Sequence, residues 1–583
     1  MSVSLANWTK QQEENEQYVE QLRKEIVDIP DTANKNCEKL IRFLAEYGIH
    51  HISEIDYPLR EEFSRYLNLT VSENSVWTYL KLFDRIKQFS LQQQMQTLTG
   101  MRECQWRYEN KILFIPYHSN PEIVKAFESV RNRRNMVWNF QLSCSGKLKK
   151  QIFGVLNYII ENYEASRMRE YRLTGLQYLY EYCVKGEIDD IELIEQVQVY
   201  GFEKYLEERI NTAQRRKRLI PIIDIARKFL FLQQGEEVHW YANIWYLERF
   251  HFTKARLNPS DRIESISFLE VTHRENRKLL QEFMKYELGV TELAISTICG
   301  KYFHIRGFLE ELSTEGVCVC ECGAERIHKY LNRPEFDKLT SKTYNTRIAS
   351  LQYFFKFLEI KGYIKKIPFY MQYYLKKEMP LHHDRSIEFE ICMEIIQKLA
   401  YFPEHLRLMF LHLWSVGLRI SEVCTLKGDA YFIQNGETWM QVYQVKMHNY
   451  KRIPISDTLY QLMEVYLRKY NISSEDYIFQ NSNGGAFAYG TFMWQMKKYC
   501  RECCINNSEY LFKSHDYRHT VATMFYEHGV SLQSIRDYLG HSYEEMTQQY
   551  IDFMPKRIAK ANDAYFSEDK NSLAACLKGW ENE

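Results

Sequence analysis

The amino-acid sequence predicts a mainly α-helical protein with one small antiparallel β-sheet in its C-terminal third. Apolar residues recur at three- and four-residue spacing over most of the chain, which is the period of an amphipathic helix. Strand-like runs fall between residues 429 and 456, where DAYFI, TWMQVYQVK and KRIPIS follow one another. Asn435-Gly436 between the first two runs is typical of a two-residue hairpin turn.

The length and composition bound the possible classes of protein. A chain of 583 residues should form several domains, each with its own core. No apolar run is long enough for a membrane span, and the start MSVSLANWTKQQEENEQ lacks the apolar region of a signal peptide. The fourteen Cys are scattered, which suits a reducing cytoplasm. We therefore expect a cytoplasmic protein with no membrane contact.

The formal net charge is zero, which argues mildly against nucleic acid as a partner. A local basic surface could still bind phosphates while acidic residues elsewhere cancel the total. Two helical runs offer such surfaces. The candidate DNA contacts are Arg215, Arg216, Lys217 and Arg218 in the first run, and Lys342, Arg347 and Lys356 in the second. For both, a solvated helix face is the alternative.

Three segments, about 37–91, 175–233 and 290–361, share one pattern. In each, a Tyr-Leu pair ends a helical run, a polar turn follows, and a further helix closes on Phe. The pairs begin at Tyr66, Tyr205 and Tyr330. We interpret the segments as three related helical modules, with chance likeness between amphipathic helix pairs as the alternative.

The CVCECG stretch contains Cys318, Cys320 and Cys322 but no second Cys pair follows. Structural zinc sites usually need two such pairs, so these are expected to be loop thiols.

The stretch from Ser514 to Phe553 holds the candidate chemistry. With Ser514 as N-cap, His515 and Arg518 would lie on one face of the next helix. Ser531 is a plausible cap and Gly540 a plausible stop for a short helix, and His541 follows at once. Tyr550 offers a phenol that could act as a nucleophile.

These motifs together resemble the catalytic core of the tyrosine recombinases, the phage-integrase family. The family order is an Arg in a GLRxSE box, a hairpin Lys, His-x-x-Arg, Gly-His and a Tyr nucleophile. VGLRISEV supplies Arg419, QVKMHNYKRIP supplies Lys446, SHDYRHT supplies His515 and Arg518, LGHS supplies His541, and QQYIDF supplies Tyr550. The resemblance covers about residues 385–553 and extends weakly back to about 290.

The repeated pattern and the resemblance together give a domain plan. It comprises an N-terminal helical module (1–96), a second module with basic clusters (97–238), a SAM-like core-binding domain (239–380), and a catalytic domain with a C-terminal tail (385–583). The fold class is thus helical SAM-like DNA-binding modules followed by a tyrosine-recombinase domain. The long N-terminal half resembles that of large mobile-element transposases.

The resemblance also implies the activity. Tyr550 would attack a phosphodiester to give a 3′-phosphotyrosyl link, with Arg419, Arg518 and His541 on the phosphate and Lys446 protonating the leaving 5′ oxygen. His515 would act as a base or a donor, and Glu422 would orient Arg419, although a plain surface Glu is the alternative. Family members commonly act as homo-tetramers on two DNA duplexes, sometimes with accessory proteins, and use no cofactor or metal.

Two other classes stay open at this point. A type IB topoisomerase uses a similar set of residues to relax one duplex, and an architectural member of the family would bind DNA without cutting it. The GLRxSE and LGHS boxes favour a recombinase over the first. The complete set of six residues argues against the second.

Overall fold

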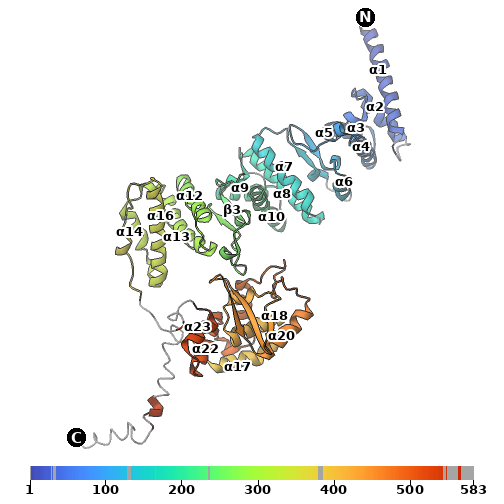
Figure 1. Ribbon diagram of the computed structural model, residues 1–583. Coiled ribbons are helices and arrows are strands. Elements are labelled where there is room, and N and C mark those ends of the chain that lie inside the picture. The colour runs from blue at the N-terminus through green and yellow to red at the C-terminus, as the bar shows by residue number, and fades with distance from the viewer. Residues whose placement is uncertain are drawn as a thin grey trace, which may run out of the picture. The chain divides into compact units, whose positions relative to one another are not determined.

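The computed structural model describes residues 2–27, 29, 35–127, 133–163, 166–233, 237–378 and 385–541, with 547, 562–565 and 567 (Figure 1). It divides into two compact units. The first contains residues 1–249 and 267–270, and the second contains 250–266 and 271–583. Within the described ranges, no helix is both long and apolar enough to cross a membrane.

Helices dominate both units, with short strands between the helical groups. The elements up to residue 127 are α1 (Ser2–Val27), α2 (Lys35–Glu46), η1 (Ile52–Glu54), α3 (Tyr57–Thr70), α4 (Glu73–Gln94), α5 (Leu98–Glu103), β1 (Ile112–Phe114), η2 (Ile115–Tyr117) and α6 (Pro121–Phe127). Those up to residue 250 are η3 (Arg133–Met136), β2 (Val137–Asn139), α7 (Gly146–Asn162), α8 (Ser166–Lys185), η4 (Ile191–Leu193), α9 (Gln196–Glu207), α10 (Ala213–Leu219), α11 (Ile222–Leu232), β3 (Ile244–Tyr246) and η5 (Leu247–Phe250).

The next group of elements ends before the predicted linker. It consists of η6 (Lys254–Arg256), β4 (Ser265–Ser267), α12 (Arg274–Val290), α13 (Ile295–Thr314), η7 (Val319–Glu321), α14 (Ala324–Leu331), α15 (Pro334–Asp337), α16 (Ser341–Ile360) and η8 (Met371–Tyr373). Residues 379–384 of the predicted linker lie outside the described residues.

The predicted catalytic domain follows from residue 385. Its elements are α17 (Phe389–Lys398), η9 (Leu399–Tyr401), α18 (Glu404–Val416), α19 (Ile420–Cys424), β5 (Tyr431–Gln434), β6 (Glu437–Gln444), β7 (Asn449–Pro454), α20 (Asp457–Lys469), α21 (Tyr489–Glu502), η10 (Ile505–Ser508), α22 (Ser514–Glu527) and α23 (Leu532–Leu539).

The prediction of a mainly helical chain with a small antiparallel sheet in its C-terminal third is confirmed, but two further two-stranded sheets, β1-β2 and β3-β4, were not predicted. β1 pairs with β2 in antiparallel register, and each contains only three residues. Three residues are too few for an alternating pattern to stand out from a loop. The sheet in the catalytic domain has the order β5-β6-β7, and the turn between β5 and β6 is formed by Asn435 and Gly436, both with positive φ, as predicted.

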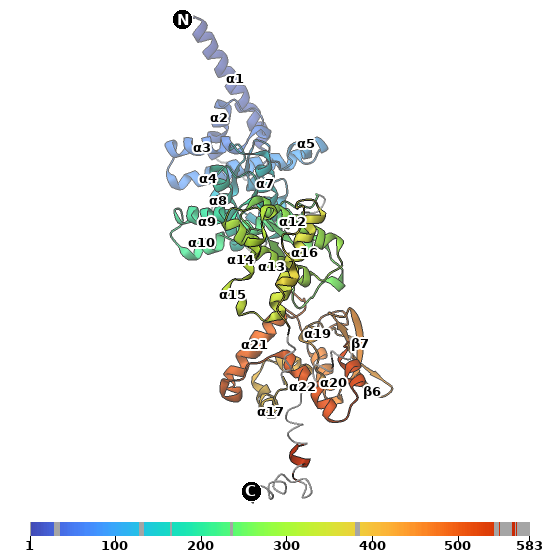
Figure 2. The same cartoon turned by 90° about the vertical axis from the view of Figure 1, so that its left-hand side faces the viewer.

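The main apolar core of the catalytic domain joins its helices to its sheet. Buried side chains of α18, α19, β6 and α22 belong to it, and Phe410 of α18 meets Tyr517 of α22 edge to face with ring centroids 5.1 Å apart. Figure 2 shows β6 and β7 side by side, with α19 and α20 near them. On β7 the alternation buries Lys451 and Ile453, so one charged residue points into this core.

Two of the predicted helix boundaries in this domain are confirmed and one is wrong. Ser531 caps α23, since its hydroxyl accepts a hydrogen bond from the backbone N–H of Ser534, and Gly540 ends the helix at φ +70°. Ser514 is not the cap of α22, because the helix begins there and Lys513 occupies the N-cap position. His515 and Arg518 nevertheless share this helix at i and i+3.

Candidate active site

Arg419 lies at a sharp corner between two helices. Gly417, at φ +69°, ends α18, and Arg419 takes the extended N-cap conformation before α19. Glu422 accepts hydrogen bonds from both the backbone N–H and the Nη1 of Arg419, each at 2.9 Å. Within the described residues, no further partner engages the Arg419 guanidinium, whose side chain is 15% exposed. Its remaining donors are therefore available to an anion.

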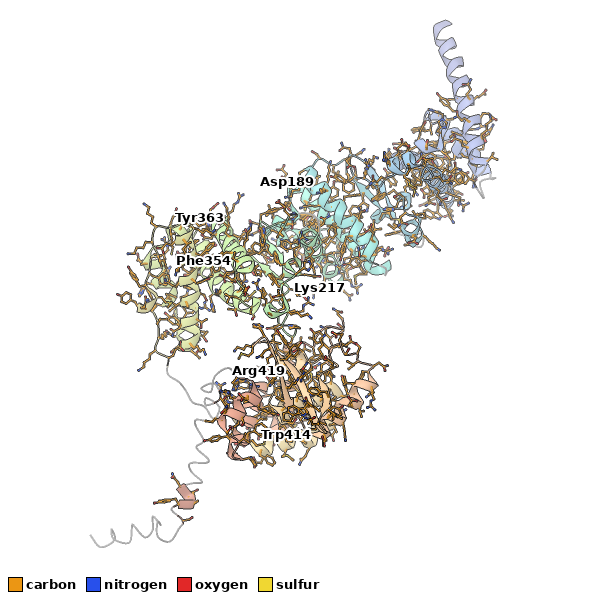
Figure 3. The ribbon with its side chains drawn as sticks, in the orientation of Figure 1. Asp189, Lys217, Phe354, Tyr363, Trp414 and Arg419 are labelled. Carbon is orange, nitrogen blue, oxygen red and sulfur yellow. The ribbon has the colours of Figure 1, made fainter. Side chains whose placement is uncertain are left out.

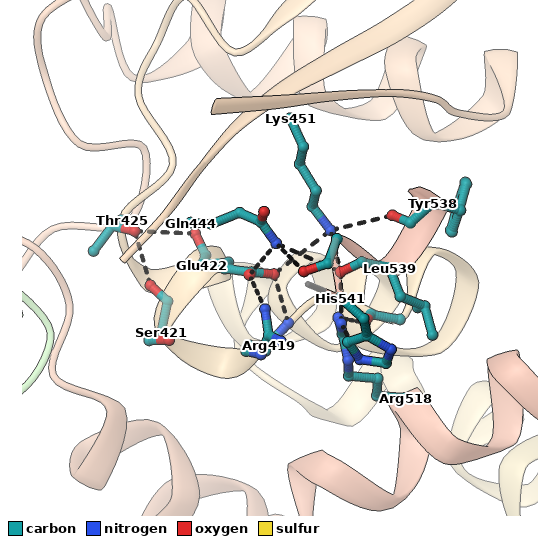
Figure 4. A network of polar contacts seen from close by, with 12 residues as sticks. Arg419, Ser421, Glu422, Thr425, Gln444, Lys451, Arg518, Tyr538, Leu539 and His541 are labelled. Atoms are coloured by element: carbon teal, nitrogen blue, oxygen red, sulfur yellow. Dashed lines mark hydrogen bonds and ion pairs between the residues drawn. The ribbon is translucent and has the colours of Figure 1, made fainter. Parts of the chain in front are cut away.

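Arg518 enters the same site from α22 and is completely buried. Its Nη1 donates to the carbonyl of Gly417 at 2.9 Å, and its Nη2 donates to the carbonyl of Leu539 at 2.6 Å (Figure 4). The guanidinium thus joins the α18–α19 corner to the C-terminal end of α23. A cation suits the last carbonyls of a helix, where the helix dipole is negative.

His541 completes the group directly after α23. Its Nε2 accepts a hydrogen bond from Arg518 Nη2 at 2.9 Å, because an arginine can only donate. Its Nδ1 lies 2.9 Å from the hydroxyl of Thr547. Burial and the charges of Arg518 and Arg419 lower the pKa of His541 to about 3. The imidazole is therefore neutral.

Glu422 lies at the centre of this network and is 1% exposed. Burial by itself would raise its pKa, but the positive charges of Lys451, Arg518 and Arg419 hold the pKa below the usual range. The group is therefore a carboxylate surrounded by cations. The prediction that Glu422 orients Arg419 agrees with these contacts, and the reading as a surface Glu is wrong.

Two members of the network were not expected from the sequence. Lys451 Nζ lies 3.8 Å from a carboxylate oxygen of Glu422 and 3.5 Å from the carbonyls of Tyr538 and Leu539. Gln444 Nε2 contacts Glu422 and the carbonyls of Leu539 and Gly540 at 3.3–3.5 Å. Burial lowers the pKa of Lys451 to about 8. The signal that could have found Lys451 is its two-residue spacing from Ile453 on one strand face.

The two remaining candidates that the structure describes, Lys446 and His515, are exposed to solvent, unlike the buried members of the network. Lys446 is exposed in the turn between β6 and β7, and His515 is exposed at the start of α22. Displacement of water by the surrounding protein and the charges of Arg518, Arg385, Arg419 and Lys446 lower the pKa of His515 to about 4. His515 is therefore neutral at pH 7.

Tyr550 lies outside the described residues. The nearest described residue before it is Thr547, which is fully buried and contacts His541.

The candidate DNA contacts differ in how exposed they are. Lys342 and Lys356 are exposed on α16, whereas Arg347 is half-buried, donates to the Tyr330 hydroxyl at 3.2 Å and stacks on Phe336. In the other group, Arg215, Lys217 and Arg218 are exposed, and Arg216 donates to the carbonyl of Ile210.

The backbone at Gly540 offers a test of this geometry. A Cβ there would lie 2.2 Å from Gln444 Nε2, and φ is +70°. We expect Gly540→Ala to shift Gln444 and His541 and to lower the rate of any reaction at this site by about 10-fold or more. Gly484→Ala is the matched control, since Gly484 has φ +74° and no atom within 4 Å of an added Cβ. Equal activity losses in the two variants would contradict the prediction.

Comparisons with known proteins place this site in a family. Residues 386–557 match the phage integrase family. Transposase B from transposon Tn554 of Staphylococcus aureus is 26% identical over 332 residues, which cover 55% of this chain and 52% of that protein. This chain thus spans about half the length of that relative. A tyrosine recombinase of Pseudothermotoga lettingae is 25% identical over 285 residues, covering 47% of this chain and 93% of that protein.

A crystal structure of XerH site-specific recombinase bound to palindromic difH substrate, a post-cleavage complex, aligns at 15% identity with a TM-score of 0.40. The alignment covers 51% of this chain and 95% of that one. Residues 386–557, which hold Arg419, Arg518 and His541, belong to the phage integrase family, the tyrosine recombinases.

Proposed function

We propose that this protein breaks and rejoins duplex DNA through a covalent 3′-phosphotyrosyl link on Tyr550, as a site-specific recombinase or transposase. The observation that carries the proposal is the convergence of Arg419, Arg518 and His541. They come from three separate segments and meet around one buried carboxylate.

The two arginines suit a phosphoryl group that gathers negative charge in the transition state. A guanidinium fork can hold non-bridging oxygens bidentately, and preorganised cations are usually the largest catalytic term. Glu422 keeps the Arg419 fork oriented before DNA arrives. Arg518 would exchange one of its present contacts for a phosphate oxygen, and His541 would then donate a hydrogen bond to the same oxygens.

The proton transfers follow from the protonation states at neutral pH. Tyr550 Oη attacks phosphorus while its proton passes to neutral His515, and the P–O5′ bond breaks as Lys446 protonates the leaving oxygen. The products are a 3′-phosphotyrosyl bond and a free 5′ hydroxyl. A 5′ hydroxyl of another duplex reverses the step, so that no external energy source is needed.

The position of Thr547 supports Tyr550 as the nucleophile. Thr547 contacts His541, and the three residues from there to Tyr550 can span at most about 10 Å. This limit on the distance favours Tyr550 as the nucleophile among the 43 tyrosines of the protein.

The proposed partners follow from the same chemistry. The substrate is double-stranded DNA, and exchange between two duplexes requires four protomers, which we propose form a homo-tetramer. Accessory recombination proteins are possible partners. The relatives include a transposase of a transposon, so we propose the ends of a mobile element as the DNA sites.

Covalent capture tests the function directly. The purified chain is incubated with nicked duplexes from the ends of its encoding element, with a chelator present, and analysed on denaturing gels. We expect a DNA adduct on the tryptic peptide that contains Tyr550, and no adduct with the variant Tyr550→Phe. An adduct on another residue, or none on DNA that is demonstrably bound, would refute the proposed reaction. Relaxation of a supercoiled plasmid that lacks any recombination site would instead indicate a topoisomerase.

A further inference from the structure

Two helical modules of this chain repeat one another at a nearly constant distance in sequence. β2, α7 and η4 begin at Val137, Gly146 and Ile191, and each has a counterpart of the same length 128 residues later, in β4, α12 and η7. The stretch 213–232, which holds α10 and α11, corresponds at the same offset to α16, over 341–360. Pro221 lies in the break between α10 and α11, whereas α16 continues through the equivalent positions.

The buried positions coincide as well. All seven buried positions of α7, from Leu148 to Ile160, fall on buried positions of α12, from Asn276 to Leu288. The five buried apolar positions of α8, from Leu173 to Cys183, fall on buried residues of α13 at an offset of 129. Chance likeness between amphipathic helices would not preserve both lengths and buried positions over a whole module.

The equivalent 3₁₀ helices are also bound in a similar way, through acceptors that lie about one helical turn apart on α7 and α12. Gln151 on α7 accepts a hydrogen bond from the backbone N–H of Ile191, the first residue of η4, at 3.0 Å. Asn276 on α12 accepts one from Val319, the first residue of η7, at 2.7 Å. Ile191 and Val319 are 128 residues apart and both are buried. Residues 137–232 and 265–360 are therefore copies of one module.

The N-terminal segment contains a similar contact. Glu25 on α1 accepts a hydrogen bond from the backbone N–H of Ile52, the first residue of η1, at 2.9 Å. Here too a short 3₁₀ helix follows two helices and precedes two more. The interpretation of three related modules thus has a structural basis that the Tyr-Leu pairs only suggested.

The earlier of the two copies has the more basic surface at the start of its closing helix. α10 contains four cationic residues and no acidic one, and Lys217 is labelled in Figure 3. Within the part of the chain that the structure describes, no ion pair engages Arg215, Lys217 or Arg218. Arg218 donates to the Tyr171 hydroxyl at 2.8 Å, which fixes it against α8. The equivalent turns of α16 contain Lys342, one of the proposed DNA contacts.

We infer that residues 137–232 form a second duplex-binding module, whose α10 contacts DNA phosphates through Arg215, Lys217 and Arg218. This rests on the proposed function, in which the later copy, residues 265–360, grips DNA beside the catalytic domain. Three cations without acidic partners are costly to gather on one short helix unless an anion meets them. A chain with zero net charge has to place its phosphate contacts locally in this way.

The test is a salt series on the full chain. Binding to a duplex from the element end is measured by fluorescence anisotropy for the wild type and for the triple variant Arg215→Gln, Lys217→Gln, Arg218→Gln. We expect the variant to bind on the order of 10- to 100-fold more weakly at physiological salt. The slope of log K against log salt should become shallower by about 3.

The control variant removes the same charge from ion-paired residues of the same unit. Arg23, Arg42 and Arg65 each lie against a glutamate on the surface, and all three are changed to Gln. We expect this control to bind DNA nearly as the wild type does. An unchanged salt slope in the α10 variant, or an equal loss in the control, would overturn the inference. The inference would also be overturned if the wild type bound RNA or an acidic protein with this salt dependence but did not bind duplex DNA in that way.

Covalent capture at saturating protein separates this inference from the proposed function. The α10 variant should form as much adduct per bound duplex as the wild type, because its active site is unchanged. If the wild type forms no adduct but the variant still loses affinity and salt slope, the proposed reaction fails and the second binding module stands.

Discussion

Replacing Arg419 by Gln should lower the rate of DNA strand cleavage by about 10³-fold while leaving duplex affinity nearly unchanged. Glu422 holds the Arg419 guanidinium with its other donors open, so that in the proposed reaction its charge is in place before the phosphoryl group gathers negative charge. Removing one preorganised donor of this kind costs about 10²–10³ in rate. Gln also removes the cation, which places the expected loss at the upper end.

The measurement is a single-turnover cleavage rate on a nicked duplex, with affinity measured separately. Arg468→Gln is the matched control, since Arg468 pairs with Glu464 on α20 and its side chain is 79% exposed. Arg419→Lys keeps the charge but loses the fork, and we expect an intermediate loss. Cleavage by Arg419→Gln within a few-fold of wild type would show that this residue does not touch the reacting phosphate.

The sequence was sufficient to predict those parts of the site that depend on local order. Ser531 and Gly540 bracket α23 because capping and positive φ are properties of single residues. The hairpin at Asn435-Gly436 follows from turn chemistry in the same way. The positions of Arg419, Arg518 and His541 followed from motif order, and the structure brings these three together.

The buried network could not be predicted, because its members come from segments distant in sequence. Lys451 and Gln444 lie on a hairpin, Glu422 on α19, and the carbonyls of Tyr538 and Leu539 at the end of α23. On the sequence alone, Lys446 fitted the family spacing and Lys451 looked like an ordinary strand residue. The structure gives them different surroundings, since the alternation of β7 buries Lys451, whereas Lys446 is exposed in the turn before that strand.

Glu422→Gln should destabilise the catalytic domain by about 3 kcal/mol, whereas Lys451→Met should change its stability by less than about 1 kcal/mol. Glu422 is the carboxylate that balances three cations, so its loss leaves buried positive charges uncompensated. Burial already lowers the pKa of Lys451 to about 8, which means that the folded protein disfavours its charged form. In the Lys451→Met background Glu422→Gln should therefore cost less, with a coupling of about 1–2 kcal/mol.

Pulse proteolysis in urea measures this coupling, with fragments of residues 385–541 followed separately from the rest of the chain. The matched cycle uses Glu404 and Lys469, the same residue types in a surface pair 2.7 Å apart, for which the coupling should be clearly smaller because water screens the charges. Equal couplings in the two cycles would contradict the buried network.

The lowered pKa of Lys451 also predicts how the stability of the catalytic domain changes with pH. Lys451 has a folded pKa of about 8 and an unfolded pKa of about 10.4, so between these values the unfolded state binds more protons. Stability should therefore rise with pH through this window in the wild type relative to Lys451→Met. Over the same window the coupling to Glu422 should shrink, because neutral Lys451 no longer attracts the carboxylate. If the coupling is undiminished at the upper end of this pH range, Lys451 is still charged there. The attraction of Glu422 would then outweigh the effect of burial on the pKa of Lys451.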